Sequence, residues 1–226
     1  MRESDNSRMF SRIASRYDLL NHLLSFNIDR LWRRRAVAEA APPSGGRVLD
    51  ACAGTGDVAI DFVRFTDASV VVAVDLSTEM MQIGRGKSPN LRIQWVEGNV
   101  MNLPFEDGLF DAVTVAFGIR NLTDYQRGVA EMARVLKPGG RLVILEFAPP
   151  ANGFLQKVYG IYLRAAVPAI GALVVGDGGA YRYLASSVEG FLARDRVLEL
   201  MGAVGLGGLR ARSLTSGIAY IYSGIK

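Results

Sequence analysis

Short apolar runs alternate with amphipathic stretches through the middle of the chain. Five of these runs consist mainly of β-branched or other apolar residues: RVLDACA, VVVAVDL, LRIQWVEG, FDAVTVAFG and RLVILEF. Continuous apolar runs of this length are typical of parallel strands that are buried on both faces. Their alternation with helices predicts a doubly wound α/β sheet.

The stretch before the fifth run has the end signals of a helix. Thr123 and Gln126 are spaced as a capping box, Val129 and Met132 lie on one stripe with Leu136, and KPGG is a stop signal. After Phe147 the alternation ends, and two further runs, GLRARSL and IAYIYSGIK, close the chain. The short TSG between them permits only a hairpin. We therefore expect a Rossmann-like, seven-stranded, mostly parallel sheet with one antiparallel strand.

The chain is expected to form a single domain, because half of its 226 residues are hydrophobic and no composition shift divides it. Within residues 1–226 we distinguish four parts. They are N-terminal helices (1–45), a sheet core (46–147), an apolar lid insertion (148–190), and a closing helix with the hairpin (191–226).

The apolar segment from Phe154 to Val175 is not expected to cross a bilayer. It carries Lys157 and Arg164 and contains Pro168, so its uninterrupted part is too short. The first ten residues are charged and polar where a secretory signal has an apolar run, which indicates a cytoplasmic location. The single Cys52 excludes an intramolecular disulfide, in keeping with a reducing compartment.

The basic excess is concentrated in RLWRRR, which places Arg30, Arg33, Arg34 and Arg35 within two turns of a predicted helix. One interpretation is a solvated helix face. The other is contact with an anionic membrane surface, peripheral and on the inner side. The cluster is not repeated and no nucleic-acid-binding motif accompanies it, so nucleic acid is not an expected partner.

The stretch DACAGTGDVA, which follows the first run, contains a glycine-rich loop. Together with Asp75 at the end of the second run, GTGDVA satisfies the pattern of dinucleotide-binding folds. A pyrophosphate prefers a bare helix N-terminus, yet Asp57 begins this helix, Asp50 precedes the loop, and no Lys or Arg lies between Arg47 and Arg64. S-adenosylmethionine has no phosphate and carries a sulfonium and an ammonium, so the charges favour it. A nicotinamide-dependent oxidoreductase remains the alternative from another class.

Ligands of open parallel sheets bind outside the carboxyl ends of the strands, and polar residues follow four of these ends. Asp75 is expected to accept hydrogen bonds from the ribose hydroxyls, and Asn99 to bond the adenine amino group. The alternatives are that Asp75 caps the helix beginning at Ser77, that Asn99 closes a turn, and that Arg120 pairs with a surface acid. The predicted donor site comprises Asp50, Gly54, Thr55, Gly56, Asp75, Leu76, Asn99, Val100 and Phe117.

Several motifs together resemble those of a known family. They are MFSRIASRYDLLNHLLSF, VLDACAGTGD, VDLSTEMM, GNVMNLPF, FGIRN, RVLKPGGRLVILEF and YRYLASSVEGF. In these motifs the chain is similar, nearly end to end, to the bacterial quinone C-methyltransferases of menaquinone and ubiquinone biosynthesis, which are class I S-adenosylmethionine-dependent enzymes. It departs from the family pattern at Asp29, where a His is usual, and at Leu192, where a Pro is usual.

The resemblance implies C-methylation of a polyprenylated quinol, with S-adenosyl-L-homocysteine as the second product. Demethylmenaquinol is the favoured acceptor, and a benzoquinol of the ubiquinone pathway stays open. Thr55, Asp75, Asn99 and Val100 match the donor-binding positions of the family. A subunit that binds the donor but is catalytically silent is a third reading, against which FGIRN argues.

Arg120 stays protonated, so it cannot be the base, but it can stabilise a developing oxyanion beside Asn121. Asp18 and His22, one helical turn apart, are the candidate bases, although a structural role for His22 is at least as plausible. We expect Tyr17, Asn21, Tyr181 and Tyr183 to line the acceptor site, and no metal to take part. The apolar insertion either walls a prenyl tail or packs helices, and a homo-oligomer is left open.

Overall fold

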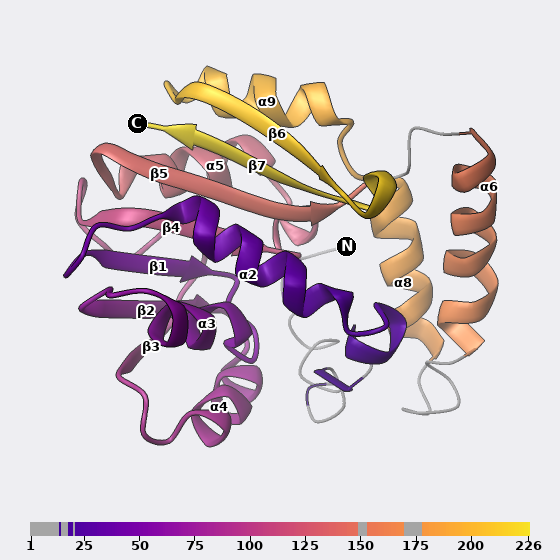
Figure 1. The fold of residues 1–226 in the computed structure, drawn as a ribbon, viewed down its shortest axis with the longest axis horizontal. Helices are drawn as coiled ribbons and strands as arrows, with labels where there is room; N and C mark the ends of the chain where they lie inside the picture. Colours follow the sequence, from indigo (N-terminus) through magenta and orange to yellow (C-terminus); the bar gives the residue numbers. More distant parts are fainter. Residues whose placement is uncertain (1–13, 15–17, 20, 149–152, 170–177) are drawn as a thin grey trace.

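The computed structural model describes residues 14, 18–19, 21–148, 153–169 and 178–226. Its centre is a seven-stranded sheet of order β3-β2-β1-β4-β5-β7-β6 (Figure 1). The strands are β1 (Arg47–Ala51), β2 (Val70–Asp75), β3 (Ile93–Glu97), β4 (Phe110–Ala116), β5 (Leu136–Phe147), β6 (Gly207–Leu214) and β7 (Ala219–Ile225).

The predicted directions of the strands are confirmed. β1 pairs in parallel with β2 and β4, and β3 and β5 extend the parallel part at either side. β7 is antiparallel to β6, because a 3-10 turn at Thr215–Gly217 reverses the chain within three residues, and it also pairs antiparallel with β5. The fold is therefore the expected Rossmann-like sheet, with the carboxyl ends of the parallel strands at one edge.

Helices cover both faces of the sheet (Figure 1). On one face α2 (Ile28–Ala40) and α3 (Asp57–Phe65) bury Trp32 and Phe62 in one apolar cluster. On the other face α5 (Tyr125–Arg134) and α9 (Arg194–Ala203) bury Met132 and Met201. α4 (Thr78–Lys87) lies near the β3 side of the sheet. This three-layer arrangement leaves the carboxyl edge of the sheet for the site.

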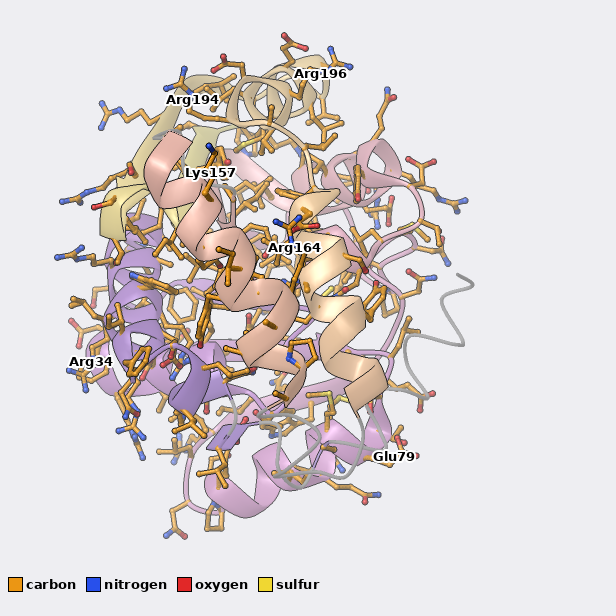
Figure 2. The ribbon with its side chains drawn as sticks, turned by 90° about the vertical axis from the view of Figure 1, so that its right-hand side faces the viewer. Arg34, Glu79, Lys157, Arg164, Arg194 and Arg196 are labelled. Carbon is orange, nitrogen blue, oxygen red and sulfur yellow. The ribbon has the colours of Figure 1, made fainter. Side chains whose placement is uncertain are left out.

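Two further helices close that edge. α6 (Gly153–Ile161), continued by a π-helix (Tyr162–Ala166), lies side by side with α8 (Gly178–Glu189) in both views (Figure 2). Leu163, Val167, Ala185 and Val188 form an apolar cluster of their own between them. We call α6, the π-helix and α8 the lid. Among the residues described here, no helix is long and apolar enough to span a membrane.

The predicted ends of α5 are wrong. Its N-cap is Asp124, whose side chain accepts a hydrogen bond from the Arg127 N–H at 2.9 Å, so the Thr123–Gln126 capping box does not form. The helix ends at Arg134, and KPGG lies inside β5. A carboxylate one position later than Thr123 caps the same turn, which explains the shift of the helix start.

Candidate active site

The loop after β1 is shaped by two glycines. Gly54 and Gly56 have φ angles of 55° and 77°, in the left-handed region. A Cβ at Gly56 would lie 2.1 Å from Cη2 of Trp95. The loop therefore turns tightly where it packs on Trp95, and its contact with a donor stays a prediction.

Asp75 holds the loops after β1 and β2 together. Its carboxylate accepts hydrogen bonds from the Gly54 N–H at 2.7 Å and the Ser77 N–H at 2.8 Å. Burial raises the pKa of Asp75 above its ordinary value. The helix cap itself is Ser77, whose hydroxyl accepts from the Met80 N–H. Asp75 thus lies between two predicted donor segments, and its contact with a ribose stays a prediction.

Asp50 lies beneath the loop, with 1% of its surface exposed. It accepts hydrogen bonds from the Ala59 N–H at 3.0 Å and the Thr114 hydroxyl at 3.4 Å. Burial first, and the carboxylates of Asp75 and Asp57 in addition, raise its pKa to about 8. The predicted donor site therefore contains a carboxyl group that holds its proton to an unusually high pH.

The loop after β3 is closed by Asn99. Its side-chain oxygen accepts from the Met101 N–H at 2.8 Å, and Asn99 also pairs with Asn102. The turn-closing alternative for Asn99 is therefore realised, whereas its contact with adenine stays a prediction. Val100 is buried, and Leu76 is exposed at the end of β2. An exposed apolar side chain beside Asp75 is suited to cover the face of an aromatic base.

Arg120 lies in a 3-10 turn (Ile119–Asn121) directly after β4, and its side chain is almost fully buried. Its Nη1 donates to Glu146 Oε1 at 2.7 Å and to the Phe117 carbonyl at 2.5 Å. The expectation of a surface acid as its partner is wrong, because Glu146 is completely buried at the end of β5. Burial raises the pKa of Glu146, although the Arg120 guanidinium opposes the rise. The one acidic residue of RLVILEF was the sequence signal for this partner.

Aromatic rings surround this ion pair. Phe117, in the left-handed region at φ 56°, has its ring centroid 4.5 Å from that of Phe147. The Arg120 guanidinium lies 5.6 Å from the Phe147 ring centroid, and Trp32 packs against both rings. The carboxyl ends of β4 and β5 therefore carry an aromatic wall beside a charged pair.

The lid contributes tyrosines to the same region. The Tyr183 hydroxyl donates to Asn121 Oδ1 at 3.1 Å, which joins α8 to the turn that carries Arg120. Burial raises the pKa of Tyr125, with the neighbouring Tyr183 second, and burial also raises that of Tyr159 on α6. Tyr125 and Tyr159 were not predicted. Tyr17 and the side chain of Tyr181 lie outside the described residues.

The two candidate bases of the N-terminal segment have different partners. Asp18 accepts from the Thr55 hydroxyl at 2.5 Å and from Lys87 Nζ at 2.6 Å. His22 Nδ1 lies 2.8 Å from Asp29, which also pairs with Arg33, so His22 has a structural contact. The carbonyl of Asn21 accepts from the Ser25 N–H in the same turn.

Asp57 has cationic partners that its neighbours in the sequence do not reveal. The fold brings Lys87 Nζ to 2.6 Å and Arg33 Nη2 to 3.2 Å from its carboxylate, and these cations lower the pKa of Asp57 although burial opposes them. Arg33 is therefore buried in ion pairs, whereas Arg30, Arg34 and Arg35 are exposed. Within the described ranges, no group of three or more His, Cys, Asp or Glu is placed to hold a metal ion.

A profile of the ubiE/COQ5 methyltransferase family matches residues 1–226. The chain belongs to this family. A demethylmenaquinone methyltransferase of Deinococcus radiodurans is 48% identical to it over 96% of this chain and 91% of that protein. The ubiquinone/menaquinone biosynthesis C-methyltransferase UbiE of Syntrophotalea carbinolica is 47% identical over 98% of this chain and 94% of that protein.

The solved structures agree on the fold. A possible histamine N-methyltransferase from Thermotoga maritima superposes with a TM-score of 0.69, covers 97% of this chain and 98% of its own, and is 19% identical. As a member of the ubiE/COQ5 family, the protein is an S-adenosylmethionine-dependent C-methyltransferase of menaquinone or ubiquinone biosynthesis. The loops after β1 and β2 fit this donor, because the Asp75 carboxylate that joins them can accept further hydrogen bonds from ribose hydroxyls.

Proposed function

We propose that the protein methylates a ring carbon of a polyprenylated demethylmenaquinol and thereby forms menaquinol. The names of both kinds of relative include menaquinone formation, whereas ubiquinone appears only in the names of the UbiE relatives. A naphthoquinol is thus the acceptor common to both. The buried Arg120–Glu146 pair, beside the Phe117–Phe147 wall and beneath the lid, carries the proposal.

The wall and the ion pair suit a flat bicyclic quinol. The aromatic rings of Phe117 and Phe147 bind the fused rings by stacking. Asn121, held by Tyr183, fixes the orientation of a ring hydroxyl. The lid excludes water, which strengthens each electrostatic interaction beneath it.

S-adenosylmethionine, when bound, supplies the methyl group as an electrophile. A quinol hydroxyl releases its proton to water, which places carbanion character on the ring carbon and leaves an oxyanion. After methylation that carbon loses its own proton and the oxygen regains one, so the ring is aromatic again. Arg120 stabilises that oxyanion with its fixed positive charge. Glu146 positions Arg120 by taking a hydrogen bond from Nη1, which holds the plane of the guanidinium.

An assay with methyl-labelled donor tests the proposal. Reduced naphthoquinol and benzoquinol acceptors with matched prenyl tails are compared side by side under anaerobic conditions. Methyl transfer to the naphthoquinol, with a kcat/KM at least tenfold above that of the benzoquinol, is the expected result. A preference for the benzoquinol would assign the enzyme to the ubiquinone pathway instead, and transfer to neither would reject a quinol acceptor.

A peripheral membrane contact completes the proposal, because a polyprenyl tail is retained by the bilayer. Residues 19–35 support it, because this segment carries exposed apolar residues and exposed arginines close together in the sequence. We call these residues the N-terminal face: Leu19, Leu23, Phe26, Leu31, Arg30, Arg34 and Arg35. The Tyr162 hydroxyl donates to the Leu24 carbonyl at 2.8 Å, which joins this face to the lid. In Figure 2, Arg34 lies at the left edge of the molecule, on the side of α2 that faces away from the lid helices. Basic and apolar side chains together suit an anionic lipid surface.

A further inference from the structure

Lys87 lies where three separate parts of the chain meet. Its ammonium Nζ is 2.6 Å from Asp18 Oδ2, 2.6 Å from Asp57 Oδ1 and 3.0 Å from Thr55 Oγ1. Asp18 belongs to the N-terminal segment, Asp57 begins α3, and Thr55 lies in the donor loop. The last residue of α4 therefore connects the N-terminal segment to the loop.

The hydroxyl of Thr55 is held from two sides. It donates to Asp18 Oδ1 at 2.5 Å and accepts from Lys87 Nζ at 3.0 Å. A hydroxyl has one proton to donate, so these two contacts fix its rotation. Thr55 is buried, and α4 packs closely on the loop, since a Cβ at Gly84 would lie 2.8 Å from the Thr55 carbonyl oxygen.

Lys87 forms ion pairs with two carboxylates near Thr55, those of Asp18 and Asp57. About a quarter of each charged side chain is exposed, at 27% for Lys87, 24% for Asp18 and 27% for Asp57, so these ion pairs are screened less than surface pairs. Arg33 balances the second oxygen of Asp57 at 3.2 Å, but Asp18 faces Lys87. Removing the ammonium would leave the carboxylate of Asp18 facing that of Asp57, and like charges repel.

We propose that Lys87 is a positioning residue of the donor site. Through Asp18 it fastens the N-terminal segment against the Thr55 loop, and it thereby sets the affinity of the enzyme for S-adenosylmethionine. This inference deepens the proposed function and rests on it, because it requires the donor to bind at this loop. On this inference Asp18 is also a positioning residue, and not the catalytic base.

The test compares donor binding with turnover in the full chain. Lys87→Met keeps much of the side-chain length but removes the charge. We expect its dissociation constant for S-adenosylhomocysteine, measured by calorimetry, to rise about tenfold, while turnover at saturating donor stays within a factor of about two. Lys87→Arg should recover most of the affinity. Arg85→Met, an exposed charge removed from the same helix, is the matched control and should bind as the wild type.

Asp18→Asn removes the other charge of the Lys87–Asp18 ion pair. It replaces Lys87→Met in the binding measurement if that variant does not fold. The double variant Lys87→Met/Asp18→Asn should bind no more weakly than the weaker single variant, because both remove one shared interaction. Unchanged affinity in Lys87→Met, or multiplied losses in the double variant, would overturn the inference. Absence of donor binding by the wild type would instead overturn the assignment of the donor loop.

Discussion

Among single residues, Asp50 links the donor site to the stability of the fold. Burial raises its pKa to about 8, from an ordinary value of 3.8. Between these two values the folded protein keeps a proton that the unfolded chain releases, so the free energy of unfolding falls as the pH rises through this window. Asp50→Asn cannot ionise and can keep the hydrogen bonds to Ala59 and Thr114.

We therefore predict that Asp50→Asn flattens the pH dependence of stability between about pH 4 and pH 8 and is more stable than the wild type at pH 8. Urea denaturation at pH 5 and pH 8 measures this. Parallel profiles for the two proteins would show that Asp50 is ionised in the fold.

Arg120 has both a structural and a chemical role, and variants can separate them. Arg120→Ala leaves Glu146 buried without its guanidinium, which costs about 3–5 kcal/mol of stability. Arg120→Met/Glu146→Met removes both charges, and we predict that most of this stability returns while turnover stays at least about 100-fold below that of the wild type. Denaturation and single-turnover assays on the same samples provide the comparison. Recovery of turnover along with stability would limit Arg120 to a structural role.

At the scale of secondary-structure elements, the cap of α5 gives a direct test. Asp124→Ala removes the acceptor for the Arg127 N–H and should lower the free energy of unfolding by about 1 kcal/mol. Gln126 belongs to the predicted Thr123–Gln126 capping box, so Gln126→Ala is the control. It should lower the free energy of unfolding by less than Asp124→Ala does. A larger loss in the control than in Asp124→Ala would restore the capping box.

The elements themselves were largely predictable, because strands buried on both faces have continuous apolar runs. The hairpin was predictable too, since three residues permit no crossover between β6 and β7. Local patterns did not reveal the partners of the site residues. Glu146 meets Arg120 across 26 positions, and Lys87 meets Asp18 across 69, so neither contact has a periodicity to detect.

At the scale of the whole molecule, we expect the enzyme to reach its acceptor by binding the membrane through the N-terminal face. Phe26 is 77% exposed and Leu23 48% exposed, and the arginines around them are exposed as well. We predict that Leu23→Asp/Phe26→Asp lowers binding to phosphatidylglycerol vesicles at least tenfold in co-sedimentation. Turnover of a short-tailed, water-soluble quinol should be unchanged.

Ile225→Asp is the control, because Ile225 is also exposed but lies at the far end of β7, opposite Arg141. It should bind the vesicles as the wild type does. Equal vesicle binding by the double variant and the wild type would remove this face from the membrane contact.

The close contact of Trp95 with Gly56 and Gly84 provides a natural optical reporter. A Cβ at either glycine would lie within 2.2 Å of Cη2 of the indole, so the ring rests against both the donor loop and α4. The chain has only two tryptophans, and Trp32 lies apart from this contact, packed against Phe117 and Phe147. In a Trp32→Phe background, the emission of one indole would therefore follow the donor loop directly, without any attached dye.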